Sequence, residues 1–290
     1  MIAGFFQSIA KLIIWRPDVV FAKGGYVCLP VGIAARLLRI PLVIHDSDAH
    51  PGLTNLVLSK WATSIATGAP LKYYPYPTTK ARYVGIPIST DFHIFTDKEY
   101  DDARVKWGMS SEYPLVVITG GGLGASRIND AVALIVDDLL VFCSVVLISG
   151  MNQYDELRSI TPQNSDRFQL HSFVSSGMAS LLGAADVVVT RAGATTILEL
   201  AALAKPTILI PNGKLTGGHQ LKNAAVYLKE DAVKVVDENI MLEDPRILLS
   251  EIRDLLSNPS GAHKMAQSFA SFARPNAARD VADMILACVN

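Results

Sequence analysis

Arg191-Ala-Gly-Ala-Thr-Thr-Ile-Leu-Glu199 is the stretch of sequence that decides the fold. The apolar run Ala184-Ala-Asp-Val-Val-Val-Thr190 before it predicts a buried strand, and a helical pattern from Thr195 to Ala204 ends before Pro206. A strand, a glycine turn and a helix N-terminus form an anion site, because free backbone N–H groups and the helix dipole both favour phosphate. Glu199 falls about one turn into the helix, where its carboxylate can accept hydrogen bonds from sugar hydroxyls. The segment predicts a nucleotide-diphosphate site; the alternative is an ordinary strand–turn–helix with a solvated glutamate.

A second glycine loop favours the nucleotide interpretation. Leu115 to Gly120 predicts a buried strand, and Gly120-Gly-Gly-Leu-Gly-Ala125 fits the relaxed G-x-G-x-x-[GA] spacing. A nicotinamide site also needs an acid at the end of the next strand, about 20 residues further on. That strand, Ser144 to Ile148, is followed by Ser-Gly-Met-Asn and no acid. A sugar nucleotide, with its ribose on Glu199, is therefore favoured over a dinucleotide, and no cofactor is expected.

Composition sets the class of protein. The 290 residues are enough for two domains of ordinary size, and half of them are hydrophobic. A formal charge of −1 and a pI near 6.6 argue against a nucleic-acid partner, which would show a basic patch. The cysteines, Cys28, Cys143 and Cys288, are unclustered and predict small buried thiols in a reducing compartment, without a structural zinc.

The N-terminal segment is unusually apolar. It lacks the basic start of a secretory signal, and no run of 18 apolar residues follows it. The apolar residues follow helical spacing: Ile2, Phe5, Phe6, Ile9, Leu12 and Ile13. Core packing explains such a stripe, and docking on a membrane surface is the alternative.

Strands and helices alternate along the chain, which predicts parallel, doubly wound sheets. Expected strands are Asp18–Ala22, Pro41–His45, Thr63–Ala66 and Arg82–Val84, followed by strands starting near Leu115, Ser144, Phe168, Val187, Thr207 and Val233. We expect domains at 1–90 and 91–274, and a helix at 275–290 that packs back on the first domain. At ~30 residues per βα unit, roughly 60–70 residues of the first domain are expected to be lacking.

Several motifs in the same order resemble one known family. They are Lys23-Gly-Gly-Tyr-Val27, His45-Asp-Ser-Asp-Ala-His-Pro-Gly-Leu-Thr-Asn55, Gly85-Ile-Pro87, Gly120–Ala125, Arg191–Glu199 and Thr216-Gly-Gly-His-Gln-Leu-Lys-Asn223. The set is similar to the bacterial UDP-N-acetylglucosamine–lipid I N-acetylglucosaminyltransferases, the MurG type of glycosyltransferase family 28. The resemblance implies the GT-B fold, with two Rossmann-like domains, the first N-terminally truncated. It implies inverting transfer of GlcNAc from UDP-GlcNAc to the muramoyl 4-hydroxyl of undecaprenyl-linked lipid I, at the cytoplasmic face of the bacterial membrane.

The resemblance also assigns donor-binding positions. Val174 would hold uracil, Glu199 would bind ribose, and Gln220 would contact the donor sugar. The residues expected at the nucleotide and its phosphates are Ala194, Thr195, Thr196, Ile197 and Leu198.

The sequence departs from the family pattern at four places that concern substrate binding or catalysis. The N-terminal Gly-Gly-Thr-Gly-Gly-His loop, with its proposed catalytic histidine, is not in this sequence. Asp48 stands where the family has asparagine, Ser89 where it has arginine, and Gly122 where it has serine; Asp48 and Gly122 are still expected at the substrates. A truncated enzyme, a divergent one, or a separate chain that supplies the first units would each explain the pattern.

The cluster His45-Asp-Ser-Asp-Ala-His50 has several interpretations. Two carboxylates and two imidazoles can bind a divalent metal, but a loop that caps a helix is favoured, so no metal is predicted. Asp46 and His50 are candidate general bases in place of the lost histidine; the catalytic residue is otherwise unknown. His219, beside Gln220, suits either a lid over a sugar or a capping loop.

Two other functions compete with the transferase. One is an incomplete or non-catalytic UDP-sugar-binding module that needs a partner chain. The other is a UDP-GlcNAc 2-epimerase, which is less favoured because Lys23-Gly-Gly-Tyr26 and His219-Gln-Leu-Lys-Asn223 fit the transferase better.

Overall fold

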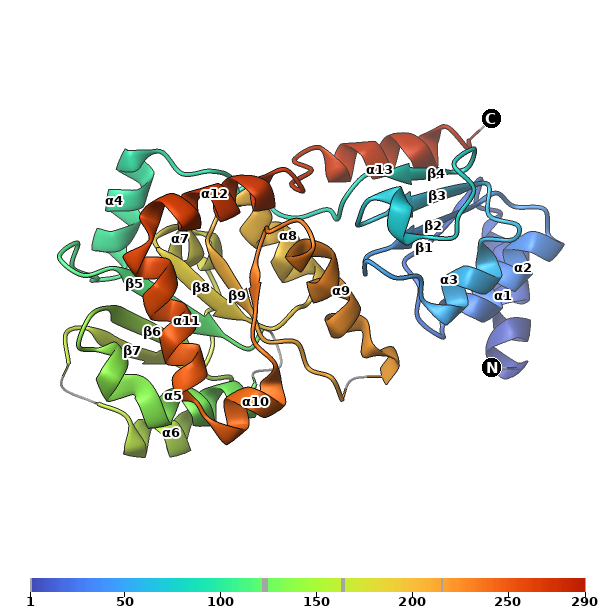
Figure 1. Ribbon diagram of the computed structural model, residues 1–290. Coiled ribbons are helices and arrows are strands. Elements are labelled where there is room, and N and C mark those ends of the chain that lie inside the picture. Colours follow the sequence, from blue (N-terminus) through green and yellow to red (C-terminus); the bar gives the residue numbers. More distant parts are fainter. Residues whose placement is uncertain (1, 122–124, 163–164, 215, 290) are drawn as a thin grey trace. The chain divides into compact units, whose positions relative to one another are not determined.

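The structure is a computed structural model that describes residues 2–121, 125–162, 165–214 and 216–289 (Figure 1). The chain forms two compact units, residues 1–88 with 274–290, and residues 89–273. Each has its own parallel sheet and is described by itself. The doubly wound α/β class expected from the sequence is confirmed.

The first unit is built on a sheet with strand order β1-β2-β3-β4 in the described residues, all neighbours parallel. Its elements are α1 (Ile2–Trp15), β1 (Val20–Ala22), α2 (Cys28–Leu37), β2 (Leu42–Asp46), α3 (Leu53–Leu58), β3 (Ser64–Thr67), η1 (Leu71–Tyr73), β4 (Ala81–Tyr83) and α13 (Ala277–Leu286). Every residue of β2 is buried, because helices cover both faces of a parallel sheet.

The C-terminal helix α13 belongs to this first unit. Its residues Val281 and Met284 pack on Ala66 of β3 and on Val84, which follows β4. The segment that leads into α13 passes close to Gly85, which has a φ of +81°. A Cβ added at Gly85 would lie 2.6 Å from the Cβ of Arg274. Residues about 200 apart in sequence thus share one small core.

The second unit contains a parallel sheet with strand order β10-β9-β8-β5-β6-β7 in the described residues. The strands are β5 (Leu115–Thr119), β6 (Ser144–Ile148), β7 (Phe168–His171), β8 (Val187–Thr190), β9 (Thr207–Leu209) and β10 (Lys234–Val235). The helices are α4 (Asp97–Lys106), α5 (Ser126–Leu139), α6 (Tyr154–Ile160), α7 (Met178–Gly183), α8 (Ala194–Ala202), η2 (Thr216–Gly218), α9 (His219–Leu228), α10 (Glu238–Glu243), α11 (Arg246–Ser257) and α12 (Pro259–Ala270).

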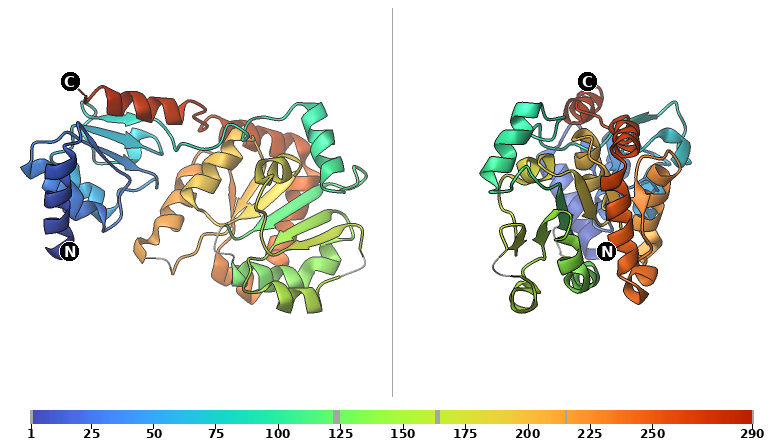
Figure 2. Two further views of the ribbon diagram at one scale, coloured as in Figure 1. Left: turned by 180° about the vertical axis from the view of Figure 1, so that it is seen from behind. Right: turned by 60° about the vertical axis from the view of Figure 1, so that its left-hand side comes forward.

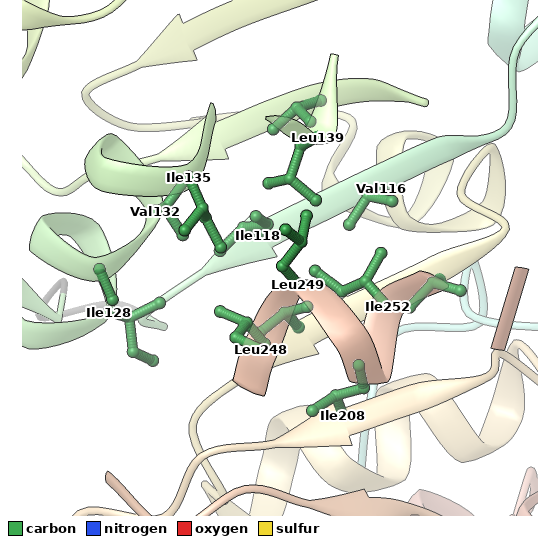
Figure 3. Packing of buried hydrophobic residues seen from close by; sticks show 14 of the residues in the cluster. Val116, Ile118, Ile128, Val132, Ile135, Leu139, Ile208, Leu248, Leu249 and Ile252 are labelled. Atoms are coloured by element: carbon green, nitrogen blue, oxygen red, sulfur yellow. The ribbon is translucent and has the colours of Figure 1, made fainter. Parts of the chain in front are cut away.

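One face of this sheet carries a continuous hydrophobic core (Figure 3). Val116 and Ile118 of β5 point into it, because alternate strand residues face the same side. The buried stripe of α5 contributes Ile128, Val132, Ile135 and Leu139, and α11 contributes Leu248, Leu249 and Ile252. The spacing of these residues follows the 3.6-residue helical period.

The direction of the chain through the sheet reverses beside β5. From β5 it steps to β6 and β7, and from β8 it steps the other way to β9 and β10. Right-handed crossovers then place α5 and α8 on opposite faces of the sheet. Figure 2, seen from behind, shows α8 and α9 in front of the strands, on the side away from α5 and α11. The crevice between the two sets of loops is where such folds bind ligands.

Replacing Ile118 by alanine tests the core of the second unit. Ile118 is fully buried at the centre of the cluster, so Ile118→Ala is expected to lower the free energy of unfolding by about 2–5 kcal/mol. Ile160→Ala, at an exposed position of the same unit, should change it by less than about 0.5 kcal/mol. Urea unfolding followed by circular dichroism measures both, and equal small effects would show that Ile118 is not a core residue.

Candidate functional site

A pocket of about 590 Å³ lies at the carboxyl edge of the second unit's sheet. It is enclosed by the segments that follow β5, β6, β8 and β9. The residues that line it are Gly120, Gly121, Ala125, Ser126, Arg127, Ser149, Gly150, Asn152, Gln153, Thr190, Arg191, Gly193, Thr196, Asn212, Lys214, Gln220 and Glu238. The two segments singled out in the sequence, after β5 and after β8, are therefore brought to one site.

The start of α8 presents free backbone donors. Gly193 caps the helix in an extended conformation, and its carbonyl accepts the first helical hydrogen bond, from Ile197 N–H at 3.0 Å. The N–H groups of Ala194, Thr195 and Thr196 precede that bond and have no partner within the helix. The side chains of Ile197 and Leu198 are buried in the domain. Among the five residues predicted to contact the nucleotide and its phosphates, Thr196 lines the pocket.

Glu199 stands in the second turn of α8. Its side chain is half-buried, and no described residue donates a hydrogen bond or forms an ion pair with it. Burial raises the pKa of this carboxyl above its usual value. An unpaired, partly desolvated carboxylate gains most from an incoming hydroxyl donor, which is the role expected of it.

Two arginines and one glutamate form the charged wall of the pocket. Glu238, in the first turn of α10, accepts hydrogen bonds from Arg191 Nη2 at 2.5 Å and from Arg127 Nη1 at 2.9 Å. Lys214 also lines the pocket and is exposed. The balance of these groups is positive, which suits a diphosphate. Thr190, wholly buried beside them, has a hydroxyl without a hydrogen-bond partner among the described residues.

Gln220 lies at the mouth of the pocket, in the first turn of α9. Its Oε1 accepts a hydrogen bond from Asn212 N–H at 2.8 Å, which leaves the amide N–H₂ group for another acceptor. Gly217 and Gly218 before it have φ angles of +77° and +61°, a conformation that glycine adopts without strain. Asn223 then ties α9 to the other loop, through Nδ2 to the carbonyl of Ala192 at 3.1 Å.

Glu199 and Val174, two further predicted donor positions, are not among the residues that line the pocket. Val174 is buried in the segment after β7. Gly122 lies outside the described residues. The pocket wall at Ser149 and Gln153 is held by Asn129 of α5, whose Nδ2 donates to the carbonyl of Ser149 at 2.8 Å and to Gln153 Oε1 at 2.8 Å.

The cluster at residues 45–50 belongs to the first unit, at the carboxyl end of β2. His45 is wholly buried, and burial lowers its pKa, so the ring is neutral. Its Nε2 lies 2.8 Å from the carbonyl of Gly85, which can only accept, so Nε2 carries the proton. Ser47 Oγ then donates to Nδ1 at 3.2 Å. His45 therefore acts as a structural residue that joins β2 to the turn at Gly85.

Asp46 is bound on both oxygens. Asn55 Nδ2 donates to Oδ1 at 2.6 Å, and the hydroxyl of Tyr76 donates to Oδ2. The N–H of Gly52 also reaches Oδ1, at 3.4 Å. Burial raises the pKa of the carboxyl, and the hydrogen bonds from Tyr76 and Asn55 oppose that rise. The Asp46 carboxylate thus joins the two ends of the loop from residue 46 to residue 55.

Asp48 and His50 stand in that loop and are both half-buried. The hydroxyl of Tyr74 donates to the backbone carbonyl of Asp48 at 2.6 Å and accepts from Ala69 N–H at 3.2 Å. Tyr74 and Tyr76 stack on one another, with ring centroids 5.7 Å apart. No group of three His, Cys, Asp or Glu side chains suited to a metal occurs within the described ranges.

Three residues that line the pocket were not predicted from the sequence as site residues: Arg127, Lys214 and Glu238. Arg127 lies two residues after the glycine loop Gly120–Ala125, so its position in the chain was a usable signal. Glu238 lies 111 residues further along, and it reaches the pocket only because α10 lies near the carboxyl edge of the sheet. No motif connects the two positions.

Replacing Tyr76 by phenylalanine tests the loop closure. Tyr76→Phe leaves one oxygen of buried Asp46 without a donor, which is expected to cost about 1–3 kcal/mol of the free energy of unfolding at neutral pH. The Tyr76 hydrogen bond favours the ionised carboxyl and lowers the pKa of Asp46. The cost should therefore be largest above that pKa and shrink as the pH falls through it and the carboxyl is protonated.

Tyr26→Phe is the matched control, because Tyr26 is exposed in the same unit. Urea unfolding between pH 4.5 and 8 measures both variants. A cost that does not change with pH would show that the hydroxyl does not act on Asp46.

Comparison with known proteins places the chain among glycosyltransferases. The model of the glycosyltransferase family 28 C-terminal domain matches residues 115–281, and that of the N-terminal domain matches residues 1–67. Among curated relatives, an enzyme of Natranaerobius thermophilus is 33% identical over 231 residues, or 77% of this chain and 62% of that protein. An enzyme of Acetivibrio thermocellus is 37% identical over 216 residues, or 72% of this chain and 57% of that protein. Both are named UDP-N-acetylglucosamine–N-acetylmuramyl-(pentapeptide) pyrophosphoryl-undecaprenol N-acetylglucosamine transferase.

Solved structures match the fold of the chain. The crystal structure of Acinetobacter baumannii MurG matches with a TM-score of 0.79 and 26% identity, over 98% of this chain and 77% of that one. The UDP-GlcNAc 2-epimerase of Neisseria meningitidis, bound to UDP-GlcNAc, matches with a TM-score of 0.69 at 13% identity, over 98% of this chain and 80% of that one; this likeness concerns the fold alone. The chain thus spans about 60% of the length of these curated relatives, and the GT-B fold expected from the sequence is confirmed. Since the C-terminal-domain model alone matches more than half of its 290 residues, the chain belongs to glycosyltransferase family 28.

Proposed function

We propose that the chain binds UDP-GlcNAc in the pocket of the second unit and transfers GlcNAc, with inversion, to the muramoyl 4-hydroxyl of undecaprenyl-linked lipid I. The observation that carries this proposal is the start of α8. Gly193 and Thr196 line a positively charged pocket, and Glu199, which has no partner among the described residues, follows one turn later. Phosphate on amides with ribose on a nearby acid describes a nucleoside diphosphate. The names of the relatives support the identity of the sugar and of the acceptor.

Each group then has a definite part in the transfer. The amides of Ala194, Thr195 and Thr196 and the positive charge of the pocket stabilise the diphosphate as it leaves with the bonding electrons. Glu199 holds the ribose, and the free amide group of Gln220 holds the transferred sugar. The acceptor hydroxyl must lose its proton to a base. Asp46 and His50 of the first unit are the candidates for this base.

The first unit has the features of a peripheral membrane-binding module, and the lipid-linked acceptor supports this assignment. Leu12 of α1 is buried and Phe5 half-buried, so part of the apolar stripe is core. Other large apolar residues of the helix stay exposed: Ile2, Phe6, Ile13, Ile14 and Trp15. No helix in the described ranges is both long and apolar enough to cross a bilayer. An exposed apolar stripe of this kind binds at the surface of a membrane.

Two measurements on the full chain test the function. Calorimetry with UDP-GlcNAc should show binding, and with NAD should show none. A radiolabel assay with a lipid I analogue should show GlcNAc transferred and UDP released in equal amounts. Absence of UDP-GlcNAc binding at millimolar ligand would refute the donor site. Binding without transfer would instead favour the alternative of a sugar-nucleotide module that needs a partner chain.

Glu199→Ala should weaken binding of UDP and of UDP-GlcNAc by the same amount, about 1–3 kcal/mol. The loss is equal because the carboxylate contacts ribose, which both ligands share, and not the transferred sugar. Equal affinity of the variant and the parent for UDP would remove Glu199 from the site.

The pH dependence of UDP-GlcNAc binding reports the ionisation of Glu199. Its pKa is raised in the free protein, and a ribose hydroxyl donates more strongly to the ionised form. Affinity should therefore fall as the pH drops through this pKa, and Glu199→Gln should abolish that part of the pH dependence. Calorimetry between pH 4.5 and 8 is the measurement; parallel curves for both proteins would contradict the assignment.

The exposed stripe of α1 should control binding to liposomes. Phe6→Ser/Ile13→Ser removes two side chains that are 66% and 51% exposed, and it should reduce co-sedimentation with vesicles of anionic phospholipid. Leu134→Ser, an exposed leucine of the second unit, is the control and should leave partitioning unchanged. Unchanged partitioning of the double variant would show that α1 does not bind the membrane.

A further inference from the structure

One carboxylate in the donor pocket neutralises only one of the two guanidinium groups bound to it. Glu238 is 5% exposed and uses one oxygen for Arg191 and the other for Arg127. Two guanidinium groups share this single carboxylate, so one unit of positive charge remains in the cluster. A charge held at the edge of a buried network is costly unless a ligand meets it.

The two arginines differ in how many of their N–H groups remain available to a ligand. Arg191 is 9% exposed, and it donates Nη2 to Glu238 and Nη1 to the carbonyl of Ile210 at 3.0 Å. Arg127 is 29% exposed and uses a single N–H of its five, from Nη1 to Glu238, among the described residues. Arg191 is therefore a structural cation, whereas Arg127 lines the pocket with donors still available.

The position of Arg127 is unfavourable for the helix that carries it. It is the second residue of α5, where the positive end of the helix dipole disfavours a cation. Glu238 offsets this repulsion but is shared with Arg191. A side chain that opposes the local preference of its helix, in a pocket, marks a place where function outweighs stability.

We propose that Arg127 binds the diphosphate of the nucleotide donor, and that Glu238 acts as a positioning residue that holds the guanidinium toward the pocket. Arg127 keeps one N–H on Glu238 and turns its free N–H groups to the phosphate oxygens. The planar guanidinium suits this task because it can bind a carboxylate and a phosphate on different edges. The inference rests on the proposed function, since it names the cation of the same donor site.

The test compares Arg127→Gln with the parent in the full chain. Arg127→Gln should weaken UDP about ten- to a hundredfold, the effect of losing charge-assisted hydrogen bonds. Uridine, followed by NMR titration at millimolar concentration, should bind both proteins alike. Arg127→Lys should lie between them, because an ammonium cannot span the carboxylate and the phosphate at once. The thermal midpoint of the unliganded variant should stay near that of the parent, since Arg191 still pairs with Glu238.

Arg158→Gln is the matched control, an exposed arginine of α6 that does not line the pocket, and it should bind UDP as the parent does. If the parent binds UDP and Arg127→Gln binds it equally well, the inference is overturned while the donor site stands. If uridine and UDP weaken equally in Arg127→Gln, the residue acts on the fold, which also overturns it. If the parent binds no UDP at all, the proposed function itself fails.

Discussion

The parallel pairing of β5 with β8 is the interaction on which the donor site depends. Thr119 is paired with Thr190, so both strands end at the same level of the sheet. After β5 the chain continues to β6 and β7, and after β8 it continues the other way, to β9 and β10. The helices that follow β5 and β8 therefore lie on opposite faces of the sheet. The loops at Gly120 and Arg191 must therefore diverge, and the space between them is the pocket. A different strand order would separate the same two motifs without changing either one.

The carboxylates of this unit are held in different electrostatic states. Glu238 is buried but paired with two arginines, whereas Glu199 is half-buried with no partner among the described residues. Burial alone makes a charged group costly, and pairing offsets that cost. The paired acid can only hold its neighbours in place, while the unpaired one gains stability when a hydroxyl donor arrives. Their surroundings assign one to structure and the other to binding.

The sequence predicted the fold well because the signals were local. The buried runs after Leu115, Ser144 and Val187 lie on strands, as their apolar composition indicated. The helix after Gly193 begins where the free N–H groups were expected. Such features depend on residues a few positions apart, which periodicity and turn chemistry record. The binding of a nucleotide at this helix remains a prediction.

The charged wall of the pocket could not be predicted in the same way. Arg127 and Glu238 meet through the packing of α5 and α10 on one sheet edge, and no spacing rule connects residues 111 positions apart. A lone glutamate at the start of a short helix is normally solvated and interacts favourably with the helix dipole. Only its burial and its two partners reveal another role.

The loop after β2 in the first unit shows the same division between local and tertiary signals. In the sequence, His45, Asp46, Asp48 and His50 are four polar residues at the end of one strand, and their spacing does not show which of them are structural. Tertiary contacts separate them, since His45 is fixed by Gly85, and Asp46 by Asn55 and Tyr76. Tyr74 holds the backbone at Asp48 and so fixes the path of the loop toward His50. Two residues of the cluster thus hold the loop in place, and the tyrosines that complete this support come from the segment between β3 and β4.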